Sequence, residues 1–94
     1  MSAGALSAAS RPAIGVGFRL QWEPVQNAHV LLYPEGMIKL NASAGEILKR
    51  CNGEATIGEI TADLERAFST TGIAGDVMSF ISMAAEKKWL QIPA

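Results

Sequence analysis

The sequence VLLYPEGMIKLNASAGE, from Val30 to Glu46, decides the fold because it holds the clearest turn and helix-start signals in the chain. Pro34 sets φ for the first corner of a tight turn, and Gly36 tolerates backbone conformations that other residues resist. Apolar segments lie on both sides of this turn. The chain is therefore predicted to reverse direction here and to place two strands side by side.

A helix is predicted to begin where this stretch ends. Asn41 and Ser43 can each cap a helix through a side-chain oxygen. Ser43 and Glu46 also have the spacing of a capping box, in which each residue covers a free backbone N–H of the other. The sheet is therefore expected to stop at Asn41.

Three short strands are predicted before that helix. The segment FRLQWE, Phe18–Glu23, alternates between apolar and polar residues, and Pro24 ends the pattern. Ala28–Tyr33 and Gly36–Leu40 follow as the second and third strands. The turns between them predict an antiparallel meander.

Two helices are predicted to follow the strands. An apolar stripe over Ala44–Cys51 indicates the first, which Gly53 can end through a left-handed cap. Thr56 and Glu59 form a second capping box, after which apolar residues recur at helical spacing as far as Phe68. Both helices can lay an apolar face against the sheet.

A third helix is predicted from Asp76, which favours a helix start. Its apolar face comprises Val77, Phe80, Ile81 and Ala84. Strands followed by helices, without alternation of the two, predict an α+β fold. The expected arrangement is a three-stranded antiparallel sheet followed by three helices, similar to a winged helix-turn-helix. Residues 1–13, which are rich in Ala, Ser and Gly, are expected to form a flexible tail, and residues 14–94 the domain.

Composition and charge exclude several functions. A chain of 94 residues has room for one small core. Its net charge of −1 argues against nucleic acid and anionic membranes as partners. No segment approaches the ~20 apolar residues of a membrane span. The one cysteine fits a reducing cytoplasm, and no Cys/His cluster indicates a metal site. No cofactor is expected.

Catalysis has little support in the sequence. His29 lies on a predicted strand without a Ser or Cys nucleophile near it in sequence, and Cys51 lies on the apolar stripe of a helix, where a small core residue is the ordinary interpretation. The rival function is a winged-helix DNA-binding regulator, suggested by the helix order alone. The third helix, taken as Ala74–Lys88, lacks the basic surface that phosphate requires, because acids offset its two lysines.

Large soft side chains are more numerous than one inward stripe requires: Met37, Met78, Met83 and Trp89. They either fill irregular gaps in the core or line a binding groove. The open edge of a three-stranded sheet can accept an extended peptide as a further strand. In the third strand, Ile38 and Leu40 are expected to face inward and Met37 and Lys39 outward, although a shift of one residue exchanges the faces.

The residues LLYPEG at Leu31–Gly36, LN at Leu40-Asn41, AGEILKRCNG at Ala44–Gly53 and Thr56-Ile57 resemble the PqqD family. The resemblance spans about Phe18–Trp89, and Asn52 stands where Asp is more usual. It implies a non-enzymatic carrier in pyrroloquinoline quinone biosynthesis, a recognition element for ribosomally made, modified peptides. Such a carrier binds the precursor peptide PqqA. It presents that peptide to the radical S-adenosylmethionine enzyme PqqE, which cross-links a Glu and a Tyr of PqqA.

The resemblance also implies that the peptide lies along the third strand and against the third helix. Periodicity then selects the side chains on those two elements. A monomer is expected, and the open strand edge could permit a strand-exchanged dimer in crystals. The expected peptide contacts are Met37, Ile38, Lys39, Leu40, Val77, Met78, Ile81, Met83, Ala84 and Trp89.

Overall fold

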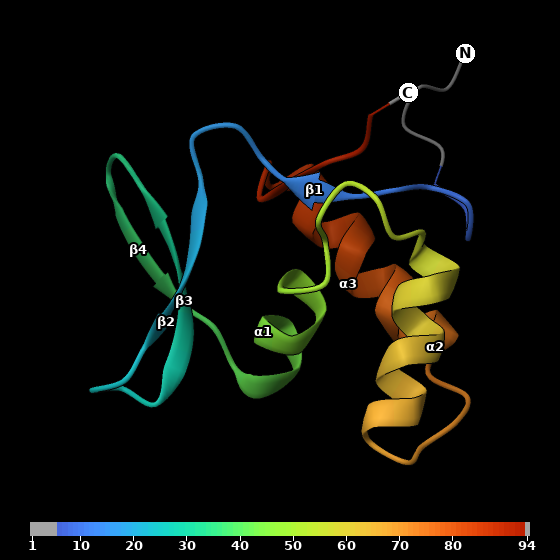
Figure 1. The fold of residues 1–94 in the computed structure, drawn as a ribbon. Coiled ribbons are helices and arrows are strands. Elements are labelled where there is room, and N and C mark those ends of the chain that lie inside the picture. Colours follow the sequence, from blue (N-terminus) through green and yellow to red (C-terminus); the bar gives the residue numbers. More distant parts are fainter. Residues whose placement is uncertain (1–5, 94) are drawn as a thin grey trace.

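The computed structural model describes residues 6–93, and the three strands of its main sheet precede its three helices in the predicted order (Figure 1). A small second sheet pairs two short strands from opposite ends of the described chain, β1 (Ala13–Ile14) and β5 (Leu90–Gln91). The α+β class is confirmed. Winged helix-turn-helix describes it only loosely. The main elements are β2 (Arg19–Glu23), β3 (Ala28–Tyr33), β4 (Gly36–Lys39), α1 (Ala42–Leu48), α2 (Ile57–Ala67) and α3 (Ala74–Glu86).

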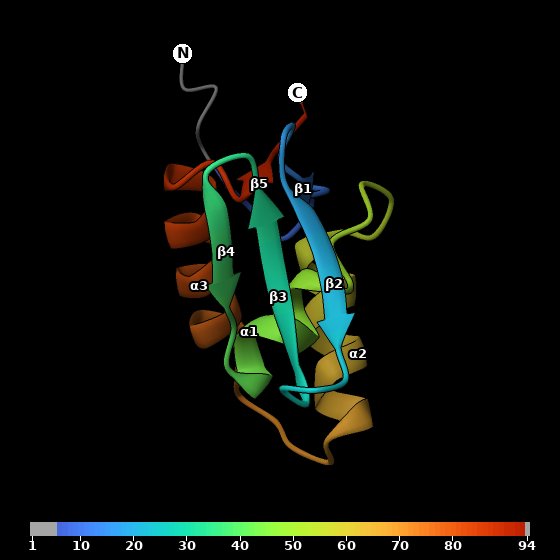
Figure 2. The same ribbon diagram turned by 90° about the vertical axis from the view of Figure 1, so that its left-hand side faces the viewer.

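The main sheet is an antiparallel meander with the order β2-β3-β4. Tyr33 pairs with Gly36, so Pro34 and Glu35 form a two-residue turn between β3 and β4. Gly36 does not adopt a positive φ, so the conformational tolerance expected of it is not used. The sheet faces the viewer in Figure 2, with the helices behind it and α3 on the β4 side.

One face of the sheet packs toward the helices. Leu20, Leu31 and Ile38 pair across the three strands and therefore point to the same side. Leu31 is fully buried, and Ile38 packs against the core partly buried. Met37 and Lys39 lie on the opposite face and are exposed. The predicted inward and outward faces of the third strand are confirmed.

The start of α1 differs from the predicted capping box. Asn41 is the N-cap, and its Oδ1 accepts from the backbone N–H of Ala44 at 2.8 Å. Ser43 lies inside the helix, and Glu46 accepts from Arg50 instead of covering a backbone N–H. The prediction of a Ser43 and Glu46 box was wrong because Asn41, two residues earlier, takes the extended backbone conformation that a cap needs.

The predicted end of α1 was also wrong. The helix ends at Leu48, capped by Lys49. Gly53 does adopt a positive φ of 82°, yet it lies farther along the chain, where its N–H donates to the carbonyl of Pro12 at 2.9 Å. The left-handed conformation at Gly53 therefore shapes the connection to α2.

The second and third helices begin as predicted. The capping box at Thr56 and Glu59 forms in both directions, at 2.8 and 3.0 Å. Asp76 stands in the first turn of α3. Between the helices, the N–H of Ile73 donates to Oε2 of Glu65 at 3.2 Å, which holds the entry to α3 against α2.

Residues 6–13 pack along the helical part of the domain, whereas a loose tail was expected through residue 13. The carbonyls of Ser10 and Ala8 accept from the N–H groups of Ile57 and Gly58, both at 2.9 Å. These are N–H groups of the first turn of α2, which have no partner within the helix. Leu6 also packs against the core and Pro12 is fully buried, so both backbone bonds and side-chain packing hold this segment. Residues 1–5, the rest of the predicted tail, lie outside the described residues.

Candidate functional site

The outer edge of β4 is unpaired in the described part of the chain, because β4 has β3 on one side only. The N–H of Leu40 donates to the carbonyl of His29 at 3.0 Å, which makes these two residues a hydrogen-bonded pair. Bonded and non-bonded pairs alternate along an antiparallel ladder. Ile38 therefore also directs its backbone groups at β3, and Met37 and Lys39 direct theirs to the open edge.

The side chains predicted on β4 divide between two environments. Met37, 49% exposed, and Lys39 lie on the solvent face beside the open edge. Ile38 lies on the core-facing side with part of its surface accessible, and Leu40 is buried. Backbone groups of Met37 and Lys39 and the side chain of Ile38 are thus the parts of β4 that a ligand at the edge can reach.

The side chains predicted on α3 also divide. Val77, Ile81 and Ala84 are buried in the core, so they are not surface residues of the free protein. The partly buried set consists of Met78, Met83 and Trp89. In Figure 1, α1 lies between the sheet and the pair formed by α2 and α3. The structure therefore places β4 and α3 in separate layers.

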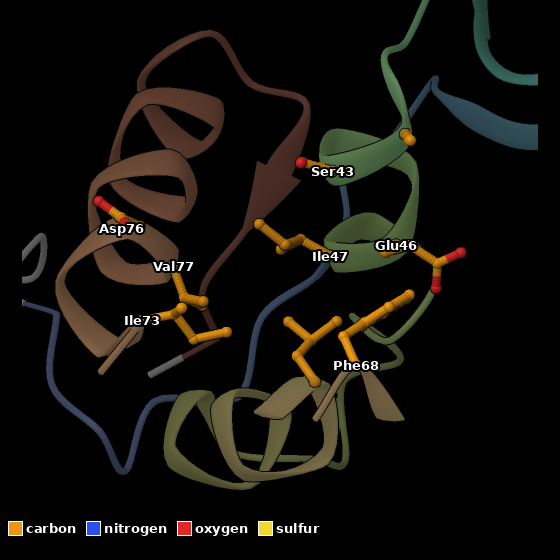
Figure 3. Close-up of a pocket in the computed structure, with 9 residues that line it drawn as sticks. Ser43, Glu46, Ile47, Phe68, Ile73, Asp76 and Val77 are labelled. Carbon is orange, nitrogen blue, oxygen red and sulfur yellow. The ribbon is translucent and has the colours of Figure 1, made fainter. Parts of the chain in front are cut away.

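A pocket of about 330 Å³ opens between the three helices (Figure 3). The buried side chains of Ile47, Leu64 and Val77 form its base, one from each helix. Phe68, at the end of α2, and Ile73, just before α3, stand at its sides. Ala42, Ser43, Glu46 and Asp76 complete the lining.

Sequence reasoning missed this pocket, although Val77 was among the predicted contacts. Phe68 offered one signal. It is in phase with the apolar stripe of α2, yet it caps the end of that helix and remains 55% exposed. Which helices meet at such a residue depends on how the helices pack, and periodicity within one helix does not give that information.

Charged side chains connect the two helices beside the pocket. Arg50 donates to Glu46 at 2.8 Å and to Asp63 of α2. The hydrogen bond from Arg50 is the main cause that lowers the pKa of both carboxyl groups. The predicted pair of Asp63 with Arg66 is present at 3.1 Å. This cluster ties the end of α1 to the middle of α2.

The two residues considered for catalysis, Cys51 and His29, each pack against other parts of the fold. Cys51 is buried, and burial raises the pKa of its thiol to about 12, so that the thiol stays protonated at neutral pH. Its interpretation as a core residue is confirmed. His29 packs edge-on against Trp22 with ring centres 5.0 Å apart, and its ring lies beside Gly45 of α1.

Residues 6–93 contain neither a candidate metal site nor a helix that could cross a membrane. No three His, Cys, Asp or Glu side chains are grouped so that they could hold a metal ion. Each helix within that range is too short or too polar to cross a membrane.

Comparison with known proteins identifies close relatives. A family model described as Coenzyme PQQ synthesis protein D (PqqD) matches residues 28–90. A protein of Stutzerimonas stutzeri named PqqA binding protein is 49% identical over 82 residues, covering 86% of this chain and 89% of that protein. A PqqA binding protein of Azotobacter vinelandii gives the same identity and coverage. One from Kluyvera intermedia is 46% identical, covering 85% of this chain and 88% of that protein.

A solved structure resembles the whole fold. It is the solution NMR structure of the PqqD truncation of Methylobacterium extorquens PqqCD, described as a functional, stand-alone recognition element for ribosomally synthesized and post-translationally modified peptides. It is 30% identical to this chain with a TM-score of 0.76. The match covers 97% of this chain and 99% of that one.

Proposed function

The chain belongs to the PqqD family, and we propose that it binds the precursor peptide PqqA and presents it to the radical S-adenosylmethionine enzyme PqqE. The observation that carries the choice of peptide is the 49% identity, over 86% of the chain, with proteins named for PqqA binding. The chain supplies a binding surface in this proposal, and the cross-linking chemistry belongs to PqqE.

The open edge of β4 supports a particular binding mode. Met37 and Lys39 each offer an unpaired backbone N–H and C=O there, and an extended peptide can bond to both residues as a fourth strand. Main-chain bonds of this kind hold the peptide backbone regardless of its side chains. Selectivity for PqqA must therefore come from side chains beside the edge.

Side chains on the core-facing side of the edge are suited to that task. Ile38 points toward the helices, and α3 lies on the β4 side of the sheet (Figure 2). Alternate side chains of an added strand would project to the same side as Ile38. The contact surface we propose keeps the predicted residues, with Leu40, Val77, Ile81 and Ala84 supporting it from the core and Met37, Ile38, Lys39, Met78, Met83 and Trp89 accessible to the peptide.

DNA binding receives no support from α3, the helix that would enter the groove. Ala74–Glu86 contains no Lys or Arg, and it carries Asp76 and Glu86. Because phosphate contacts supply most non-specific affinity for DNA, a helix with this charge is poorly suited to the task. The two lysines counted in the sequence, Lys87 and Lys88, follow the end of the helix.

Binding and presentation can be tested separately. Isothermal titration calorimetry of a synthetic PqqA peptide into the domain should give saturable binding of one peptide per chain. With PqqE and its reductant supplied, mass spectrometry should detect the Glu–Tyr cross-link in PqqA faster when the domain is present. Binding without any effect on cross-linking would remove the presentation step and leave peptide recognition intact.

A further inference from the structure

We propose that the pocket between α1, α2 and α3 holds one apolar side chain of PqqA, next to a Lys or Arg of the same peptide. This inference rests on the proposed function. It adds a second contact to the β4 edge and specifies the chemistry of the residue that makes it. The position, the lining and the charge of the pocket each contribute to it.

The position of the pocket continues the path along β4. The last residue with outward backbone groups is Lys39, and the first residue of α1, Ala42, lines the pocket. Three residues of chain span at most about 10 Å. A peptide paired with β4 therefore needs about three further extended residues to bring a side chain to the pocket mouth.

The lining selects an apolar side chain. Ile47, Leu64 and Val77 present only hydrocarbon at the base, and Phe68 and Ile73 add apolar surface at the sides (Figure 3). Phe68 is 55% exposed, an unusual state for a large aromatic side chain that neighbours the core. An apolar occupant would cover part of its ring, and burial of apolar surface favours binding.

The charge around the mouth selects a cation beside the apolar residue. Glu46 and Asp76 lie on opposite sides of the pocket with their carboxylates turned outward from it, and its lining has no Lys or Arg (Figure 3). Glu46 is already paired with Lys49 and Arg50. Asp76 forms no ion pair with any residue from 6 to 93, so it can accept one from a bound peptide.

Two substitutions change the pocket in opposite ways, and each has a matched control. Ala42→Leu places extra volume in the pocket, and Ala62→Leu adds the same volume at an exposed alanine of α2 outside it. Phe68→Ala removes an exposed aromatic wall, and Trp22→Ala removes a similarly exposed aromatic from β2. Thermal unfolding of each variant establishes that it is folded before peptide is added.

Calorimetry with synthetic PqqA then gives the dissociation constants. Ala42→Leu and Phe68→Ala should each weaken binding at least fivefold, and the two controls should stay within twofold of the unmodified domain. Alanine replacement of each apolar PqqA residue in turn should identify one whose loss weakens binding to the unmodified domain but not to Phe68→Ala.

The outcomes separate this inference from the function on which it rests. If PqqA binds and both pocket variants bind it as tightly as their controls, the pocket is not a contact, and the proposed function stands. If the unmodified domain does not bind PqqA, both fail. If amide signals of Ile47 and Ile73 shift with protein concentration instead of PqqA, a second copy of the chain occupies the pocket, which also overturns the inference.

Discussion

The backbone N–H of Leu40 donates to the carbonyl of His29 at 3.0 Å, one residue beyond the end of β4. This bond fixes which residues of the ladder are hydrogen-bonded. The backbone groups of Ile38 and Leu40 therefore point to β3, and those of Met37 and Lys39 point to the open edge. The bond also fixes the faces, because Ile38 then lies opposite Leu31 on the side of the helices. The orientation of the proposed docking strand follows from this pair.

Proline at position 37 should separate folding from peptide binding. The N–H of Met37 faces the open edge, where proline is tolerated because no ladder bond is lost. Met37→Pro should therefore fold and should weaken PqqA binding about 2- to 10-fold, the equivalent of one net hydrogen bond. The control is Met37→Ala, which removes the same exposed side chain but keeps the N–H, and calorimetry should find that Met37→Pro weakens binding more than Met37→Ala does.

Charge reversal at position 39 should act through an acidic residue of PqqA. Lys39 is exposed beside the open edge. Lys39→Glu should weaken binding more at about 20 mM salt than at about 500 mM salt, because high salt already screens part of the attraction. Arg19→Glu is the control, because Arg19 is an exposed cation on the same face at the opposite edge, β2. Equal losses for Lys39→Glu at both salt concentrations would argue against an ion pair.

Gly45 should be essential for packing α1 on the sheet. A Cβ at this position would lie 2.7 Å from Nδ1 of His29, which is closer than atoms pack. Gly45→Ala should lower the free energy of unfolding by about 1–3 kcal/mol through overpacking. Urea unfolding measures this loss. In the background of His29→Ala, where the ring is absent, Gly45→Ala should cost much less, and an unchanged cost would mean that His29 is not the cause.

Acid should weaken the tie between α1 and α2. Arg50 lowers the pKa of Glu46 and Asp63 in the folded protein, so their contribution to stability is present above the unfolded values of about 4 and is lost as pH falls through the folded ones. Arg50→Met removes the cation that both carboxylates share. The difference in urea midpoint between Arg50→Met and the unmodified domain should be largest above about pH 5 and should shrink toward pH 2. A difference that is constant with pH would assign the effect of Arg50 to packing alone.

Local signals predicted much of the fold. The turn at Pro34 and the capping box at Thr56 depend on residues close together in sequence, and both formed as expected. Asn41 and Ser43 both carry cap-forming side chains, and only the backbone conformation in the structure decides between them. The packing of residues 6–13 also escaped prediction, because it depends on backbone bonds to α2 that leave no pattern in the side chains and on only two large side chains, Leu6 and Pro12.

The candidate site was predictable to a smaller extent. Periodicity gave the correct faces of β4 and identified the apolar stripe of α3, but it could not tell that Val77, Ile81 and Ala84 would be buried in the core. A helical stripe is apolar whether it faces a core or a ligand. The pocket beside Phe68 needed the positions of three helices at once, which no single segment encodes.

A single titration tests the use of the β4 edge most directly. Synthetic PqqA is added to the ¹⁵N-labelled domain, and the amide signals of both edge strands are followed to saturation. We expect large shifts for Met37 and Lys39, whose N–H groups gain a partner, and small shifts for Leu20 and Trp22, whose N–H groups point away from β3 at the opposite edge, on β2. Saturable binding with the largest shifts on β2, and none at Met37 or Lys39, would contradict this use of the β4 edge.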